Sequence, residues 1–174
     1  MAKFKSHQEF SLEQDNMSTL QNPDFQKAFI EGVNETLRMM AELNPVQGEI
    51  AIRDQFECQG DVTGMIGMAS DHASGTVTIS FEKSTLLAIV SKVVGTNLTD
   101  LDDMALEGVG ELSNMIYGTA RAKLNDKGWK FQMALPTVIT GDYQVSSLHK
   151  GPTLIIPFTV PDLGNLFVEI TVHP

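Results

Sequence analysis

The chain has 174 residues, of which 42% are hydrophobic and 20% are charged, and its formal net charge is −10 at pH 7. This length suits one domain, and the acidic charge argues against non-specific nucleic-acid binding, in which Lys and Arg neutralise phosphates. No apolar run approaches the roughly 20 residues that cross a bilayer, and no basic amphipathic helix suits an anionic membrane surface, so we expect a protein or a small molecule as the partner.

The first 21 residues are interpreted as a tail. They contain two lysines but neither a continuous apolar segment nor a small-residue cleavage site, which argues against a secretory signal. We predict a flexible tail over residues 1–21 and a single domain over residues 22–174. Cys58 is the only cysteine and can form no internal disulfide, which fits a reducing cytoplasm.

Residues 22–44 are predicted to form the first helix. Asn22 is a typical N-cap, Pro23 suits the first helical position, and Pro45 lies beyond the end. Apolar residues at helical spacing predict its buried face: Phe25, Phe29, Val33, Leu37 and Met40. The opposite face, which would meet water or a partner, is polar: Lys27, Glu31, Asn34, Glu35, Arg38 and Glu42.

The rest of the chain alternates between short strand patterns and two more helices. Strands are predicted near residues 48–58, 62–69, 74–81, 129–135, 137–145, 153–160 and 165–172. A short, mostly buried helix over 82–96 ends at Gly95, and a long helix follows over 102–126. Pro157 has no amide hydrogen and predicts an edge strand or a bulge. This order predicts an α+β fold, in which two long helices lie on one face of an antiparallel-rich sheet.

The long helix contains three interior glycines, each of which costs about 1 kcal/mol relative to alanine. At about 100° per residue, one arc of the helix holds only polar residues and glycines: Glu107, Gly110, Glu111, Asn114, Gly118, Arg121 and Asn125. Gly110 and Gly118 lie four residues before and after Asn114, which clears the space around its amide. Gly108 falls on the buried side, where close helix packing explains it.

Two interpretations of this polar face stay open. A solvated helix face is the common case and explains the charged residues. A docking face also explains the glycines, because the close approach of another surface requires missing side chains and water does not.

The segment EGVGELSNMIYGTARAKL resembles the signature helix of the CheC/CheX/FliY chemotaxis phosphatases, whose motif is a Glu, two residues, then an Asn. Glu111 and Asn114 fit this motif. The resemblance extends to GTVTISFEKSTLLAIVSKVVG, LPTVITGD and GNLFVEITV, covers roughly residues 22–172 and favours the CheX branch. It implies a CheC-like fold.

The resemblance also implies a function, namely hydrolysis of the aspartyl phosphate on a phosphorylated CheY-type response regulator. In the family the Asn positions the attacking water and the Glu contacts a partner lysine, roles that here would belong to Asn114 and Glu111. Glu107, Gly110, Gly118 and Arg121 would contact the regulator. The chain would need no cofactor of its own, because the regulator would supply Mg²⁺, and it would form a homodimer through its sheet edges.

The family usually has Asp or Ser where this chain has Glu107, and the downstream proline, Pro136, matches the family spacing only approximately. The alternative function is therefore a non-catalytic module with the same fold that binds a receiver domain or another signalling protein.

Other candidates are weaker. Glu31 and Asn34 also match the short motif and would form a second active site, as in the CheC branch, although an ion-pair ladder on that face is the competing interpretation. The four histidines are scattered, so no metal site is predicted. Several methionines are interpreted as core filling rather than as an adaptable binding surface: Met39, Met40, Met65, Met68 and Met115.

Overall fold

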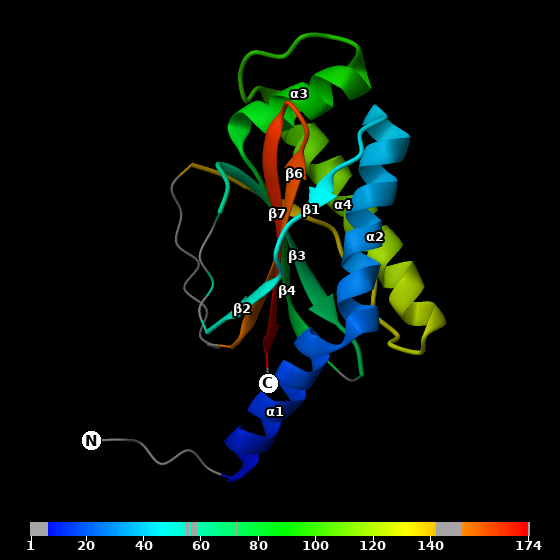
Figure 1. The fold of residues 1–174 in the computed structure, drawn as a ribbon, viewed down its shortest axis with the longest axis vertical. Coiled ribbons are helices and arrows are strands. Elements are labelled where there is room, and N and C mark those ends of the chain that lie inside the picture. Colours follow the sequence, from blue (N-terminus) through cyan, green and yellow to red (C-terminus); the bar gives the residue numbers. More distant parts are fainter. Residues whose placement is uncertain (1–6, 55, 57–58, 72, 142–150, 174) are drawn as a thin grey trace, which may run out of the picture.

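The computed structural model describes residues 7–54, 56, 59–71, 73–141 and 151–173. Within these ranges it contains four helices and one seven-stranded sheet in which every strand pairing is antiparallel. Figure 1 shows α2 and α4 along one side of the sheet, with α3 at one end and α1 at the other. The predicted α+β class and antiparallel sheet are confirmed. Among the described helices, none is long and apolar enough to span a membrane.

The elements run along the chain in the order helix–helix, strands, helix–helix, strands. The helices are α1 (His7–Gln21), α2 (Pro23–Ala41), α3 (Lys83–Val94) and α4 (Asp103–Asp126). The strands are β1 (Val46–Gln47), β2 (Ala51–Arg53), β3 (Val62–Ala69), β4 (Ser74–Phe81), β5 (Thr137–Thr140), β6 (Thr153–Val160) and β7 (Gly164–His173). Their order in the sheet is β1-β6-β7-β4-β3-β5, and β2 also pairs with β6.

Helix α1 occupies most of the segment that the sequence predicted to be a flexible tail. Its last turns bury Leu20 and Asn16, and α1 contacts both α2 and β7. Polar residues dominate this segment, so the apolar pattern is weak, and the burial of Leu20 in the common core is what anchors the helix. The boundary of the single domain at residue 22 stays a prediction.

Helices α2 and α4 begin as the sequence predicts. The Asn22 side chain accepts hydrogen bonds from the backbone N–H groups of Asp24 and Phe25, at 2.9 and 3.2 Å. Asp102 caps α4 by accepting from Ala105 N–H at 2.9 Å. These caps satisfy donors that a helix leaves unpaired at its start. Helix α2 ends at Ala41, three residues before the predicted Asn44.

The two long helices pack side by side on the same side of the sheet, as predicted (Figure 1). At Gly32 of α2, an added Cβ would lie 2.7 Å from the Ile116 carbonyl oxygen of α4, so the two backbones meet closely there. Helix α4 lies against β3, where Gly64 leaves room for Ser113. Glycines at these two contacts therefore fix the depth at which α4 sits between α2 and the sheet.

The strand predicted over residues 129–135 is absent, because the structure has an irregular segment there. Asn125, at the end of α4, accepts from Phe131 N–H at 2.6 Å and donates to Phe131 C=O at 2.9 Å. The Trp129 and Phe131 rings stack at 5.8 Å, and both rings pack near Phe25. The segment is held by the end of α4, which uses backbone groups that a strand would have paired.

Pro157 does not lie in an edge strand, because β6 has β7 on one side and β1 and β2 on the other. It lies opposite the interruption between β1 and β2, where its carbonyl accepts from Gly48 N–H at 2.8 Å. The missing amide hydrogen therefore breaks the neighbouring strand into two short pieces.

Candidate functional site

Helix α4 has the two faces that the sequence predicts. Its buried face carries Ala105, Val109, Leu112, Ile116 and Ala120, each at most 2% exposed. On the other face Glu107 and Glu111 are exposed, whereas Gly110, Asn114, Gly118 and Arg121 are half-buried. All six predicted site residues therefore lie together on the surface along one helix.

Asn114 has a free amide at the middle of this face. Its side chain forms no hydrogen bond with any other residue that the structure describes. Asn125 on the same face differs in its hydrogen bonding, because both polar atoms of its side chain bond to the backbone of Phe131. The Asn114 amide is thus available to water or to another molecule.

The three helix glycines have different surroundings. At Gly118 an added Cβ would meet nothing within 4 Å, and at Gly110 it would only touch Val138 Cγ2 at an ordinary 3.7 Å. At Gly108 it would lie 2.5 Å from Val90 Cγ2, which confirms that close packing against α3 explains this glycine. The fold therefore requires Gly108 but gives no steric reason for the two glycines that flank Asn114.

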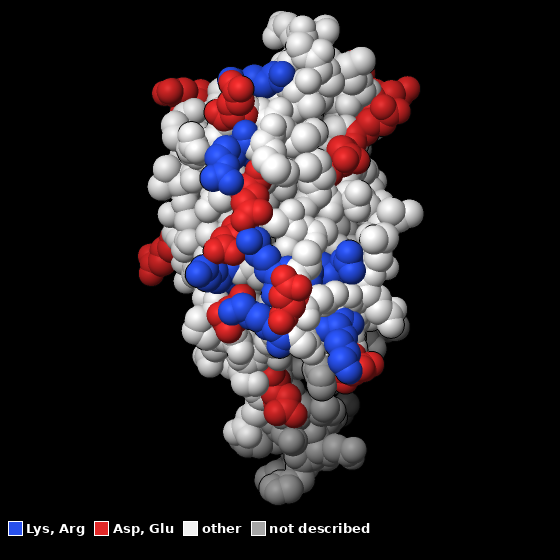
Figure 2. Space-filling model, turned by 90° about the vertical axis from the view of Figure 1, so that its right-hand side faces the viewer, with Lys and Arg blue, Asp and Glu red and all other residues white. Residues whose placement is uncertain are grey.

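Glu107 and Glu111 give the first half of α4 an acidic surface. Neither carboxylate forms an ion pair with a Lys or Arg in the described ranges. In the view onto α2 and α4 in Figure 2, basic and acidic side chains interleave lower down and along the left, whereas only acidic ones stand at the upper right, beside an uncharged band. The first half of α4 thus favours a cationic partner.

Arg121 lies further along the same face, near Tyr117. Burial raises the pKa of the Tyr117 hydroxyl above its ordinary value, and the Arg121 charge opposes that rise. The hydroxyl itself donates to Gln132 C=O at 3.0 Å. Tyr117 therefore ties the irregular segment to α4 beneath the polar face and is kept in its neutral form.

The alternative pair on α2, Glu31 and Asn34, lies among ion pairs. Lys123 of α4 contacts Glu31 at 3.0 Å and Glu35 at 2.8 Å, and Lys27 contacts Glu31 at 3.7 Å. The hydrogen bond that Lys123 donates to Glu31 lowers the pKa of Glu31, and the hydrogen bonds that Lys123 donates to Glu35 and then to Glu31 raise the pKa of Lys123. This geometry favours the ion-pair interpretation, because the Glu31 carboxylate is already engaged.

Replacing Lys123 with Met is expected to lower the free energy of unfolding by about 0.5–1 kcal/mol near neutral pH, the range of partly exposed ion pairs. The stabilisation from Glu31 is present above its ordinary pKa of 4.5 and is lost as the pH falls through its lowered folded-state value. The free energies of unfolding of wild type and variant, measured by urea denaturation, should therefore converge at acidic pH. The more exposed Lys27→Met variant is the matched control and should change less. A difference that persists at acidic pH would contradict the ion-pair explanation.

Two predictions of burial are wrong. Met39, interpreted as core, is 64% exposed, and the helix predicted to be mostly buried exposes Val93 and Val94 at its end.

The described residues include no group of three or more His, Cys, Asp or Glu that could hold a metal ion. Cys58 lies outside the described residues, and Pro136 immediately precedes β5.

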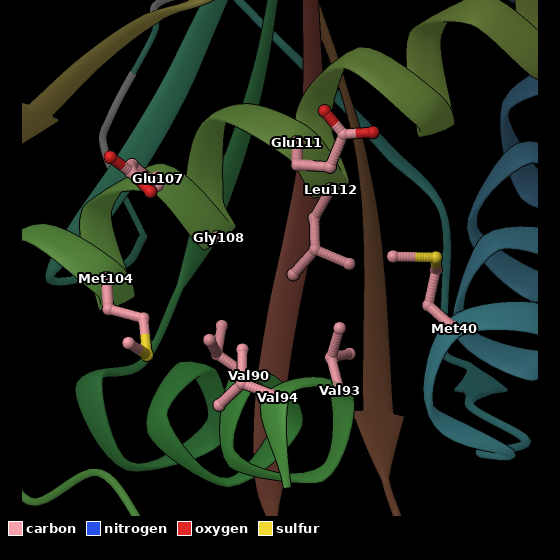
Figure 3. Close-up of a pocket in the computed structure, with 9 residues that line it drawn as sticks. All are labelled: Met40, Val90, Val93, Val94, Met104, Glu107, Gly108, Glu111 and Leu112. Carbon is pink, nitrogen blue, oxygen red and sulfur yellow. The ribbon is translucent and has the colours of Figure 1, made fainter. Parts of the chain in front are cut away.

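Beside the acidic surface lies a groove that the sequence did not reveal. It has a volume of about 200 Å³ and lies between α2, α3 and α4 (Figure 3). Its lining residues are Met40, Val90, Val93, Val94, Met104, Glu107, Gly108, Glu111 and Leu112. The only signal in the sequence was the lack of a polar face on α3, which was interpreted as burial.

Comparison with known proteins gives a consistent result. The family model of the chemotaxis phosphatase CheX matches residues 62–159, a span that includes α4. The chain is 31% identical over 135 residues to the CheY-P phosphatase CheX of Thermotoga maritima, covering 76% of this chain and 85% of that protein.

Solved structures share the fold. A CheC-like superfamily protein from Shewanella sp. PV-4 is 32% identical, with a TM-score of 0.80, over 88% of this chain and 100% of that one. A chain of the CheX-CheY-BeF3-Mg²⁺ complex from Borrelia burgdorferi is 24% identical, with a TM-score of 0.69, over 88% of this chain and 100% of that one, a likeness that establishes the fold alone. The chain therefore belongs to the CheX family of chemotaxis phosphatases.

Proposed function

We propose that this protein hydrolyses the aspartyl phosphate of a phosphorylated CheY-type response regulator in chemotaxis signalling. The observation that carries the proposal is the Asn114 amide, which is accessible, is not bonded to any described residue and has open surface at the flanking Gly110 and Gly118. The Thermotoga maritima relative, named a CheY-P phosphatase, supports the same reaction.

In the proposed reaction Asn114 enters the active site of the regulator and holds a water molecule in line with the phosphorus. The water oxygen attacks phosphorus, the bond from phosphorus to the aspartyl oxygen breaks, and inorganic phosphate and a free aspartate carboxylate result. Such a transfer requires positioning and charge stabilisation rather than covalent chemistry from the second protein. The regulator supplies Mg²⁺ together with the phosphoryl group.

The remaining residues of the face dock the partner. Glu111 pairs with a lysine of the regulator, and Glu107 adds a second carboxylate one turn earlier. Gly110 and Gly118 allow α4 to approach, and Arg121 contacts the regulator at the far end of the face. Support comes from the exposure of both carboxylates and from the lack of a described cation beside them.

We also propose that the protein acts in the cytoplasm as a homodimer joined through its sheet edges. Strand β5 ends the sheet on one side and the short strands β1 and β2 end it on the other, so both edges offer backbone groups for pairing. A monomer mass from light scattering at micromolar concentration would count against the dimer.

The direct test follows phosphate loss from phosphorylated response regulators of the same cell, with and without the wild-type protein. We expect at least one regulator to lose phosphate at least about 100-fold faster, because misplacement of a reacting group costs about that factor. The competing function is a non-catalytic receiver-binding module, which the unusual Glu107 favours. Tight binding with no acceleration for any regulator would establish that alternative and overturn the phosphatase.

A further inference from the structure

The groove beside the acidic surface is apolar, open and formed by three helices. In Figure 3, Leu112 of α4, Met40 of α2 and the valines of α3 converge on it, whereas the carboxylates of Glu107 and Glu111 point away from its floor. Near the opening of the groove, the side chains of Val93, Val94 and Met104 are 37%, 41% and 46% exposed. Exposed apolar groups that cluster within a polar rim mark interaction sites rather than ordinary surface.

The shape of the groove is fixed by the packing of α3 on α4. Gly108 lets Val90 approach α4 so closely that an added Cβ would lie 2.5 Å from Val90 Cγ2. Both Val90 and Leu112 are 2% exposed, so the floor of the groove consists of closely packed apolar side chains. The volume of about 200 Å³ compares with roughly 150 Å³ for an engineered cavity that holds benzene. The groove therefore fits one leucine-sized or aromatic side chain, and not a cofactor, whose sites occupy about 300–1,000 Å³.

The charges at the mouth narrow the choice of occupant. Glu107 and Glu111 line the groove and also belong to the face that carries Asn114. Two carboxylates without a described cation repel acidic surfaces, including an anionic membrane and the same groove of a second copy. They favour a partner that places a Lys or Arg next to its apolar side chain.

We propose that the groove binds an apolar side chain of the phosphorylated response regulator. On the regulator, this side chain lies next to the cation that pairs with Glu111. This inference rests on the proposed function, because Glu111 stands three residues before Asn114 and one docked surface would cover both the groove and the amide. The groove sets the affinity and the choice of regulator, whereas Asn114 sets the rate of hydrolysis once the complex has formed.

The test measures kcat and KM for dephosphorylation with the double variant Val93→Ser/Met104→Ser. Both side chains are exposed, so the fold should persist, which a thermal melt followed by circular dichroism checks. We expect KM to rise about tenfold with kcat unchanged, because an apolar contact made equally before and during the reaction affects binding alone. Binding of the regulator carrying beryllofluoride should weaken by the same factor. Met39→Ser, at an exposed methionine of α2 that does not line the groove, is the matched control and should leave KM unchanged.

Each outcome separates this inference from the proposed function. No acceleration by wild type overturns the phosphatase and with it the inference. Acceleration by wild type combined with an unchanged KM in the double variant overturns the groove alone, as does a fall in kcat at constant KM. A change in oligomeric mass of the double variant by light scattering would show that the groove joins two copies and would also overturn the proposal.

Discussion

Replacing Asn114 with Ala is expected to lower the acceleration of phosphate loss about 100-fold, because the water that attacks phosphorus would no longer be held in line. Binding of the phosphorylated regulator should stay nearly unchanged, since Glu111 and the rest of the face are intact. The fold should also persist: Asn114 bonds no described residue, and alanine is the better helix former. Single-turnover dephosphorylation at saturating protein measures the rate step separately from binding.

Asn125 supplies a matched control on the same helix face. Asn125→Ala removes two hydrogen bonds to Phe131 and leaves backbone groups of a buried residue unpaired, so it should lower the free energy of unfolding by about 1–3 kcal/mol. Its rate of hydrolysis should equal that of wild type under conditions where it is folded. Full acceleration by Asn114→Ala at unchanged affinity would remove the positioning mechanism.

The sequence predicted the parts of the fold that local rules determine. Asn22 is predicted as a cap because its short side chain reaches backbone donors two and three residues on, and the structure has both bonds. The alternating Leu166, Val168 and Ile170 lie buried in a strand. Such features depend on neighbours in the chain, so periodicity and cap chemistry suffice to predict them.

The failures share a physical cause, which is contact between segments distant in the sequence. Trp129 and Phe131 have strand-like composition, but Asn125 and the ring of Phe25 hold them in an irregular segment. Leu20 anchors a helix through a core that lies mostly beyond residue 21. Tertiary packing overrides a weak local preference in both cases.

The candidate site shows the same division. The spacing of Glu111, Asn114 and the glycines followed from helix geometry, and in the structure they share one face, on which Glu111 is exposed and the others are half-buried. The groove next to them requires α2, α3 and α4 at once, so a helix with an apolar end was interpreted as core. Val93 and Val94 show that a mostly apolar helix can be open at one end as well as buried.

Gly118→Leu is expected to separate stability from activity. An added side chain at Gly118 would meet no atom within 4 Å of its Cβ, and leucine in a helix interior is favoured over glycine by about 0.8 kcal/mol. The melting temperature should rise by about 2–4 °C per kcal/mol gained. The acceleration of phosphate loss should nevertheless fall about 100-fold through weaker docking, because a bulky group four residues from Asn114 would stop α4 before its amide arrives.

Two variants on the same helix show whether this effect is local. Gly108→Ala should destabilise the protein, because its Cβ would press on Val90. Ala122 is exposed one turn beyond Gly118, and Ala122→Leu should change the acceleration of phosphate loss much less. If Gly118→Leu raises the melting temperature and leaves the acceleration of phosphate loss unchanged, docking of the regulator does not require the open surface at Gly118. A glycine that the fold does not require and that only lowers helix stability would then have no role in docking, and the solvated-face interpretation of α4 would stand.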